Sequence, residues 1–431
     1  MQKNYNLEEM AFYDHLTKLK NLNSLYKDCE GKSLDNTHFI YVDLEGFKKI
    51  NEIFGYDAGN DILVEVSQKL VDYCGKSEVY RIGGDEFILL TDSHIKCEPS
   101  ELAKIFESPV KLDNMQFMIK GKISVLDHDD FPKNDLKDVL KFLDFSITDA
   151  KKNNLGNLIY ATADLKDKYN EKREIEKHFF EAIQADEFYP KFTPFVDTFT
   201  DELVGFETVS RWNFYGETLR PNMFLPIAIF TGLIYDIECK MFRETVKFIS
   251  EIKGNKHWKH AKGFKGAVNF TCQTLNRLDI SDLVKVLKEY DVQPSEVIIE
   301  MSEKSISNDC AVDRFNELRK AGFYIILDEF TTENSSICFL ADSGVNAIKL
   351  DESLLKKMDE NQEFKRMHSV YKFMTELAQK IDVRVIADGI LNKKHIKVVK
   401  ELGINIGIGH YYSRPIIKDE FIEKFFEKKG K

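Results

Sequence analysis

Several kinds of functional sequence are missing from this chain of 431 residues. Its seven cysteines are scattered and include no CxxC pair, which argues against a disulfide framework or a zinc site and favours a reducing compartment. No segment has the form GxxxxGK[ST], so a P-loop nucleotide site is excluded. The formal net charge of −11 argues against a nucleic-acid polymer as partner, because such a partner needs a basic face.

Long apolar runs are also absent. The most apolar window, residues 224–235, contains Pro226 and Gly232 and is far shorter than the ~20 residues that a membrane-spanning helix needs. The N-terminal segment lacks the basic, apolar and small-residue order of a signal peptide. These absences predict a soluble, cytoplasmic protein with no membrane span.

What the chain does contain is a Gly-Gly pair between two β-prone runs, in residues 79–90. Glycine tolerates the positive φ that many tight turns require, so the pattern predicts a β-hairpin. Asp85 and Glu86 follow the glycines directly and place two carboxylates at the hairpin tip. Such a tip suits a divalent metal ion, and an ordinary solvated turn is the competing interpretation of so short a motif.

The surrounding residues resemble the GGDEF family, the diguanylate cyclases. The matching strings are DLEGFKKIN at 43–51, FGYDAGN at 54–60 and RIGGDEF at 81–87. The resemblance covers residues 1–163 and implies an α+β, palm-like domain. It also implies the reaction of that family, in which two GTP molecules condense to cyclic di-GMP and release pyrophosphate.

In the family's site, three acids would hold two Mg²⁺ or Mn²⁺ ions over the triphosphate: Asp43, Asp85 and Glu86. The other implied contacts are to phosphate, from Lys48, Arg81 and Lys151, and to guanine, from Asn51 and Asn60. Taken singly, Lys48 or Lys151 is better interpreted as an ordinary solvated lysine, because charged side chains are mostly exposed. Because each site holds one GTP, joining two requires two domains face to face, and we expect a homodimer.

The first half departs from the family at secondary positions. Asn60 replaces an Asp that would accept hydrogen bonds from guanine, and Leu155 replaces a phosphate-binding Arg. The Arg-x-x-Asp site for product inhibition would fall on Cys74 and Ser77, so it is missing. These departures put base selectivity, GTP affinity and feedback in doubt.

The second half has the pattern of a different domain. Residues 164–177 are dense in charge of both signs and predict an exposed helical linker. From residue 178 to 431, strand-like runs alternate with amphipathic helices, as in a parallel α/β sheet or barrel. A (β/α)₈ barrel keeps its chemistry at the carboxyl ends of its strands. Six apolar runs end there in a polar residue: Glu207, Asn269, Glu300, Asp328, Lys349 and Asp388.

This half resembles the EAL family, the cyclic di-GMP phosphodiesterases, over about residues 176–420. Glu207-Thr208-Val209 stands in place of the family's Glu-Ala-Leu, and Arg211 follows at a position that contacts substrate. The resemblance implies a (β/α)₈ TIM-like barrel that binds cyclic di-GMP. Its implied metal ligands are Glu207, Asn269, Glu300, Asp328, Glu329 and Asp388. Lys349 would lie beside the attacking water, and Glu303 would brace the loop after Asp328.

The departures here concern the metals. The family's DDFGTG is DEFTTE at 328–333, and Asp388 and Ile408 replace a Glu and a Gln. Two-metal hydrolysis needs its ligands placed to within about 0.5 Å, so we expect a barrel that binds cyclic di-GMP and cleaves it poorly or not at all. Two alternatives stay open: a catalytically silent cyclic di-GMP receptor or scaffold, and a slow phosphodiesterase. The intact 83–87 motif favours the cyclase, whereas Asn60 and Leu155 favour the silent receptor.

Overall fold

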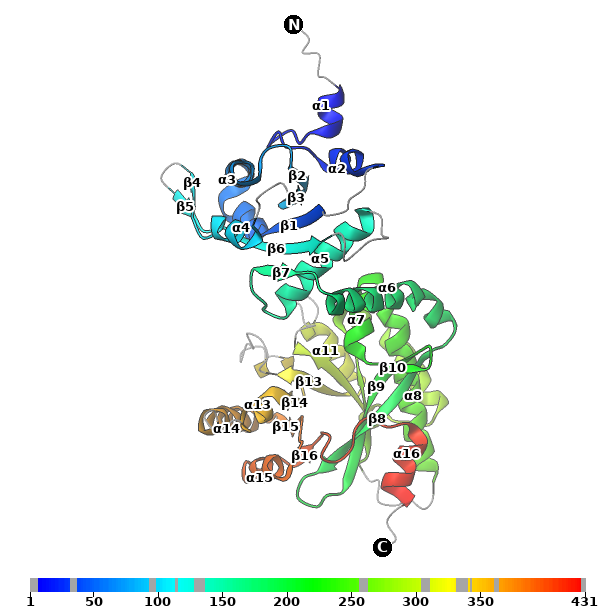
Figure 1. Cartoon of the computed structure of the whole chain (residues 1–431). Helices are drawn as coiled ribbons and strands as arrows, with labels where there is room; N and C mark the ends of the chain where they lie inside the picture. Colours follow the sequence, from blue (N-terminus) through cyan, green and yellow to red (C-terminus); the bar gives the residue numbers. More distant parts are fainter. Residues whose placement is uncertain are drawn as a thin grey trace. The chain divides into compact units, whose positions relative to one another are not determined.

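The computed structural model describes residues 7–31, 37–92, 98–112, 115–127, 136–255, 263–303, 311–330, 340–341, 343–359 and 364–427. The chain divides into two compact units, Met1–Glu174 and Ile175–Lys431. The first is a sheet covered by helices and the second is a barrel (Figure 1). The division falls inside the segment predicted as a linker.

The first unit is built on a five-stranded sheet with the order β2-β3-β1-β6-β7. β1 runs antiparallel to β3 and β6, and β7 runs parallel to β6. A separate hairpin joins β4 to β5. The strands are β1 (Thr37–Glu45), β2 (Val79–Gly83), β3 (Glu86–Asp92), β4 (Val110–Leu112), β5 (Met115–Phe117), β6 (Lys120–Asp127) and β7 (Leu158–Tyr160). The helices are α1 (Leu7–Phe12), α2 (Leu22–Cys29), α3 (Phe47–Cys74), α4 (Pro99–Ile105), α5 (Leu136–Lys152) and α6 (Ala163–Gln184).

Alternation along β1 gives this sheet an apolar layer on each face. Ile40 and Val42 belong to a core shared with α3 and α4. Phe39 and Tyr41 belong to a second core shared with α2, α5 and the start of α6. Successive side chains of a strand point to opposite faces, so one nine-residue strand serves both cores. The result is the α+β domain that the resemblance implied.

The predicted hairpin is present, but the reason given for it is wrong. β2 and β3 pair antiparallel around Gly84 and Asp85, with a register shift next to Gly83. Neither glycine has a positive φ. Cys74 is disulfide-bonded, although the scattered cysteines argued against a disulfide framework.

The predicted linker is helical, but it is not simply exposed. α6 is a single helix of 22 residues, and its first half buries Leu165 and Tyr169 in the core of the first unit. Its second half buries Ile175 and Phe179 in the core of the barrel. Full burial of a side chain as large as Phe contributes about 1.5–3 kcal/mol, so each end of α6 is an integral part of the unit that it enters.

In the second unit, eight strands close into a barrel, and β10 extends one edge as a hairpin with β9. The predicted (β/α)₈ barrel is confirmed with one variation, because β8 runs antiparallel to both β9 and β16. The remaining neighbours are parallel. The strands are β8 (Phe188–Asp197), β9 (Leu203–Phe214), β10 (Glu217–Leu219), β11 (Lys265–Asn269), β12 (Val297–Ser302), β13 (Tyr324–Phe330), β14 (Ala347–Leu350), β15 (Arg384–Ala387) and β16 (Ile406–Gly407).

Helices surround this barrel and cover its apolar outer face (Figure 1). They include α7 (Pro221–Thr231), α8 (Ile234–Gly254), α9 (Cys272–Arg277), α10 (Ile280–Glu289), η2 (Pro294–Glu296), α11 (Ala311–Lys320), α13 (Glu352–Lys357), α14 (Phe364–Lys380), α15 (Lys393–Glu401), α16 (Lys418–Ile422) and η4 (Glu423–Glu427). Among the residues described, no helix of either unit is both long and apolar enough to span a bilayer.

Candidate functional sites

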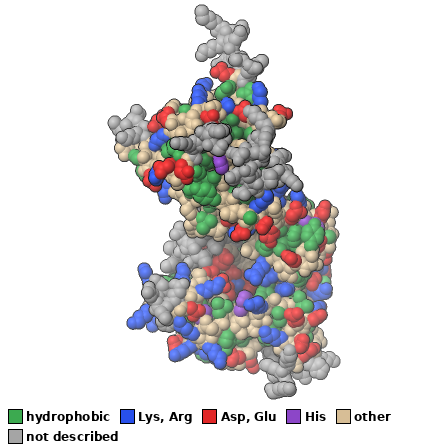
Figure 2. All heavy atoms as spheres, in the orientation of Figure 1, with side chains coloured by type: hydrophobic (Ala, Val, Ile, Leu, Met, Phe, Trp, Pro, Cys, Tyr) green, Lys and Arg blue, Asp and Glu red, His purple; other side chains and the backbone are tan. Residues whose placement is uncertain are grey.

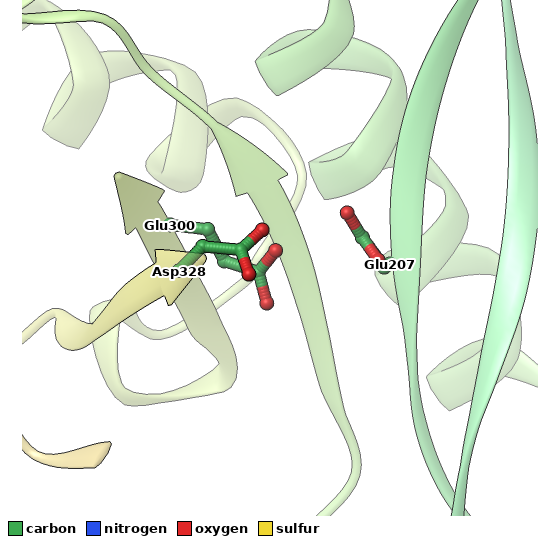
Figure 3. Close-up of side chains that lie close together, drawn as sticks. All are labelled: Glu207, Glu300 and Asp328. Carbon is green, nitrogen blue, oxygen red and sulfur yellow. The ribbon is translucent and has the colours of Figure 1, made fainter. Parts of the chain in front are cut away.

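The carboxyl ends of the barrel strands bring four of the predicted residues together. Asn269 and Glu300 are register partners on β11 and β12. Glu207 and Asp328 belong to the flanking strands, β9 and β13. Alternation along each strand turns these side chains away from the outer core, and Figure 3 shows Glu207 facing Glu300 and Asp328. One oxygen from each of these three carboxylates lies within 4.8 Å of the others.

Lys349 lies among these carboxylates. From β14, its Nζ is 3.0 Å from Glu300 Oε2, 3.0 Å from Asp328 Oδ2 and 3.3 Å from Glu207 Oε2. Asn269 Nδ2 donates to Glu207 Oε1 at 3.0 Å, which leaves the amide oxygen available. The lysine and Glu300 are almost completely buried, so their charges are screened little by water.

The pKa values show how the charges depend on one another. Burial raises the pKa of Glu300 well above its usual value, and it raises the pKa of Asp328 as well. Burial by itself would also raise the pKa of Glu207. The charge of Lys349 and the hydrogen bond from Asn269 outweigh burial, so the pKa of Glu207 is below its usual value. Burial would lower the pKa of Lys349, but the three carboxylates outweigh it and keep the lysine charged.

This arrangement fits a divalent cation. Three carboxylates face one lysine, so negative charge is in excess, and Glu300 Oε1 is buried with no hydrogen-bond partner among the described residues. Oxygen ligands of this kind suit Mg²⁺ or Mn²⁺. Glu207, Glu300 and Asp328, with the amide oxygen of Asn269, would hold such an ion.

The two substituted ligand positions lie outside this close group. Glu329 has φ 53°, at a point where the register between β13 and β14 shifts, and its Oε2 accepts a hydrogen bond from Ser302 Oγ at 2.7 Å. A bulge of this kind redirects side chains. Asp388 follows β15, and burial raises its pKa to about 7. Ile408, at the position of the family's Gln, belongs to an apolar layer inside the barrel. Thr331 and Glu333 lie outside the described residues.

A cavity of about 300 Å³ adjoins the carboxylate group. Glu207, Asn269 and Asp328 line it, together with apolar side chains of α7 and α8. Arg211 lies four residues beyond Glu207 on the same face of β9, half-buried, and its guanidinium donates to the carbonyl oxygen of Ser210 at 2.7 Å. Burial lowers the pKa of Arg211, and repulsion from the neighbouring Arg220 adds to the shift, while Glu207 opposes it.

Sequence reasoning missed Glu238, which lines the same cavity. Both of its carboxylate oxygens accept from the backbone N–H of Thr271 at 3.0 Å, so it fixes the chain just after Asn269. Burial raises the pKa of Glu238 to about 7. The available signal was an acid within the apolar stripe of α8, beside Ile234, Ile237 and Met241.

In the first unit, the three predicted acids are neighbours. Asp43 and Glu86 are register partners on β1 and β3, and Asp85 precedes Glu86 at the hairpin tip. Burial raises the pKa values of Asp85 and Glu86, and nearby carboxylates add to the shift. Lys151 Nζ lies 2.5 Å from Asp43 Oδ1, so the predicted lysine does reach the acids.

Asp144 is a fourth acid of this cluster that sequence reasoning missed. It lies on α5, two turns before Lys151 and on the same side of the helix. Burial raises its pKa, followed by repulsion from Asp43. Its spacing of seven residues from a predicted lysine was the signal that could have identified it.

The residues predicted to contact GTP in the first unit differ in their surroundings. Arg81 Nη1 donates to Asp14 Oδ1 at 2.8 Å and Nη2 donates to the Gly84 carbonyl at 2.7 Å, so the hairpin itself engages this arginine. Lys48 and Asn60 are exposed on α3. Asn51 packs so closely on Gly59 that an added Cβ there would lie 1.9 Å from its Oδ1.

Comparisons with known proteins identify both units. The family model described as "EAL domain" matches residues 176–415, more than half of the chain. The model described as "Diguanylate cyclase, GGDEF domain" matches residues 11–156. The chain is a GGDEF–EAL tandem protein.

Curated relatives have the same tandem arrangement along nearly the whole chain. This GGDEF–EAL protein is 26% identical to the signaling protein YkoW of Bacillus subtilis over 99% of its length and 55% of YkoW. It is 22% identical to the bifunctional diguanylate cyclase/cyclic di-GMP phosphodiesterase MucR of Pseudomonas aeruginosa, over 97% of its length and 62% of MucR. The chain therefore spans little more than half the length of these relatives.

A solved structure shows the same fold across both units. The S helix-GGDEF-EAL structure of Vibrio cholerae LapD, bound to c-di-GMP, matches with a TM-score of 0.60 at 16% identity. That match covers 94% of this chain and 97% of LapD's solved chain. At this level of identity the likeness establishes the fold alone.

Proposed function

We propose that this protein acts in cyclic di-GMP signalling: the GGDEF unit condenses two GTP into cyclic di-GMP, and the EAL barrel binds cyclic di-GMP and hydrolyses it poorly or not at all. The observation that carries the first part is the group of acids at the hairpin, where Asp43, Asp85 and Glu86 are strand neighbours. The observation that carries the second is the close group of Glu207, Glu300 and Asp328 beside a cavity.

In the GGDEF unit, the acids would hold Mg²⁺ or Mn²⁺, which neutralises charge on the attacked phosphoryl group. The hydroxyl of the buried Tyr41 donates a hydrogen bond to the Glu86 carboxylate and so helps to fix its orientation. Lys151 is placed beside Asp43, where its ammonium group would meet phosphate oxygens. Each unit binds one GTP, so this proposal includes a homodimer in which two units exchange attacking 3′-hydroxyls.

In the barrel, Arg211 would contact a phosphate of cyclic di-GMP, and Lys349 would keep the carboxylates in place. The proposal of weak hydrolysis rests on Glu329, Asp388 and Ile408. The Glu329 carboxylate is bonded to Ser302, and an apolar side chain stands at position 408. Both features leave a second metal ion with fewer suitable ligands than the family's own residues would provide.

One experiment tests both halves. Purified protein is incubated with Mg²⁺ or Mn²⁺ and, in separate reactions, with GTP, with ATP, with their mixture and with cyclic di-GMP, and the products are resolved by chromatography. We expect cyclic di-GMP from GTP and no more than traces of linear dinucleotide from cyclic di-GMP. If neither reaction gives product but calorimetry detects cyclic di-GMP binding, the second candidate function, a silent receptor, replaces the first. The engagement of Arg81 by Asp14 and the hairpin favours that second candidate.

Restoring the family's residues should raise hydrolysis by the barrel. We expect the combined variant Glu329→Asp, Asp388→Glu, Ile408→Gln to cleave cyclic di-GMP at least about tenfold faster than the unaltered protein, because a second ion gains ligands of suitable length. The measurement is the rate of linear dinucleotide formation with Mn²⁺. Adding Glu207→Gln to the same variant should remove the gain. Rapid cleavage by the unaltered protein would show instead that the substituted ligands suffice.

We expect the residue at position 60 to contribute to the selectivity of the GGDEF site between guanine and adenine. An Asp there would accept two hydrogen bonds from guanine, whereas the Asn60 amide turns a donor group toward guanine's own donors. A mismatched polar contact costs about 1–3 kcal/mol, so Asn60→Asp should raise the preference for GTP over ATP by roughly 10- to 100-fold. The ratio of kcat/KM values for the two nucleotides measures this. Asn213→Asp, exposed on β9, is the matched control, and an unchanged ratio in Asn60→Asp would show that this position does not read the base.

A further inference from the structure

A second and larger cavity, of about 690 Å³, opens at the amino ends of the barrel strands. Its lining includes the first residues of five strands, and so lies at the end of the barrel opposite to Glu300 and Asp328. The five are Lys265, Tyr324, Ala347, Arg384 and Ile406. Ligand cavities in proteins have volumes of roughly 300–1,000 Å³, so this cavity has room for a small molecule.

The alternation of the strands links the two ends of the barrel. Lys265, Tyr324 and Arg384 each lie four residues before a site residue on the same strand or just after it, and so on the same face. Between the two ends, the barrel interior holds an apolar layer: Phe195, Ala267, Ile298, Ile326, Ala347, Ile386 and Ile408. The interior therefore has acids at one end, an apolar middle, and cations at the other end.

The two cations at the amino end are near each other. Arg384 donates a hydrogen bond to the Tyr324 hydroxyl, and Lys265 Nζ lies 5.2 Å from the centre of the Tyr324 ring. Lys265 Nζ donates to the carbonyl oxygen of Ser295, which uses one of its three protons. Burial and repulsion from Arg384 lower the pKa of Lys265, so a negative charge between the two side chains would relieve an unfavourable interaction.

Among the described residues, no carboxylate forms an ion pair with Lys265 or Arg384. The charge of Glu296 partly offsets the lowered pKa of Lys265, but its carboxylate pairs with Lys253 Nζ at 2.9 Å. Asp197 Oδ1 accepts from the backbone N–H groups of Phe199 and Thr200, each at 2.9 Å, and so stabilises the turn after β8. Asp382 is exposed in the turn that precedes β15. The helices next to the cavity add positive charge: α14 and α15 together carry eight Lys and Arg against two Glu. Figure 2 shows Lys and Arg gathered over this part of the barrel unit, in a chain whose net charge is −11. Such a surface attracts anions.

We propose that this cavity binds an amphiphilic organic anion, with its apolar body against Ile298, Ile326 and Ile386 and its anionic headgroup between Lys265 and Arg384. The apolar layer excludes a highly polar ligand from the barrel interior, and the paired cations select a carboxylate, sulfonate or phosphate headgroup. This site is separate from the cyclic di-GMP site and does not rest on the proposed function.

The test uses two fluorescent probes of nearly the same shape. The first, 8-anilinonaphthalene-1-sulfonate, is anionic, and the second, N-phenyl-1-naphthylamine, is its neutral analogue. The full chain is titrated with each, and the double variant Lys265→Met, Arg384→Gln should bind the anionic probe about tenfold more weakly or worse, since charge-assisted hydrogen bonds are lost. Binding of the neutral probe should change less than twofold. Ala347→Leu, which adds a larger side chain inside the cavity, should weaken the binding of both probes. Decanoate should displace both probes from the unaltered protein.

Three controls make the outcome decisive. Circular dichroism melting confirms that each variant is folded, and Arg384→Gln alone, at an exposed position, serves if Lys265→Met does not fold. Arg366→Gln, exposed on α14, removes a charge away from the cavity and should leave both affinities unchanged. Glu300→Gln should also leave them unchanged. The proposal is overturned if the charge variants bind the anionic probe as tightly as the unaltered protein does. It is also overturned if Glu300→Gln weakens binding of the anionic probe as much as the charge variants do.

Discussion

Replacing Lys349 by Met should reduce the free energy of unfolding of the barrel by about 3–5 kcal/mol in the presence of EDTA, because it leaves buried carboxylates without their cation. Lys349 Nζ lies 3.0–3.3 Å from Glu207, Glu300 and Asp328, and its exposed fraction is 1%. Methionine has a similar length and packs without a charge, so the variant isolates the electrostatic loss. Urea unfolding followed by tryptophan fluorescence measures the barrel by itself, since both tryptophans, 212 and 258, belong to the second unit.

The same variant tests the metal site. Mn²⁺ should stabilise Lys349→Met more than the unaltered protein, because the divalent ion replaces the missing positive charge. Without metal, the penalty should be smaller at pH 5 than at pH 8. Carboxylates with raised pKa values hold more protons when folded than when unfolded, so stability falls as pH rises through that range. Lys356→Met, which removes a surface ion pair with Glu352, should cost less than about 1 kcal/mol. A loss this small in Lys349→Met would contradict the assignment.

The fold was predictable where a strand or helix has one buried face. On α3, the residues Ile62, Leu63, Val66 and Leu70 have the spacing of one helical face, and that face is buried. The polar residues after apolar runs also meet at one end of a barrel. The antiparallel direction of β8 was not predictable, because alternation along a strand carries no information on the direction of its neighbours. The exposure of α6 was also mispredicted. Its charges are dense, but four apolar residues among them are enough to pack both of its ends.

The candidate sites were predictable as sets of residues and not as geometries. Spacing identified Glu207, Glu300 and Asp328, but it could not show that Lys349 lies among all three, since four separate strands determine that placement. Arg81 shows the same limit: its contact with Asp14 joins residues 67 positions apart. Glu238 and Asp144 were missed because single acids on helices are common on protein surfaces. Only tertiary packing makes these two notable.

The second large effect concerns the hairpin of the GGDEF unit. Asp85→Asn should lower the rate of cyclic di-GMP formation by roughly 10³-fold or more, because a metal ion that stabilises the charge of phosphoryl transfer contributes several kcal/mol to the barrier. Asn has the same shape as Asp, and burial already disfavours the charge of Asp85, so the fold should be kept or slightly stabilised. Product formation from GTP with Mg²⁺, measured by chromatography, gives the rate, and circular dichroism melting gives the stability.

Asp72→Asn is the matched control for this variant, because Asp72 is exposed on α3 and its Oδ1 accepts a hydrogen bond from Gln68 on the same helix. It should keep the rate of the unaltered protein within a factor of about two, as expected for an exposed site away from the acids. Because cyclisation needs two units, mixing unaltered protein with excess Asp85→Asn should also lower the rate per unaltered unit, as most unaltered units are then in mixed dimers that contain only one complete site. Full activity of Asp85→Asn would show that the hairpin acids do not hold the catalytic metal, and the acids of the barrel would then be the site of any metal-dependent chemistry.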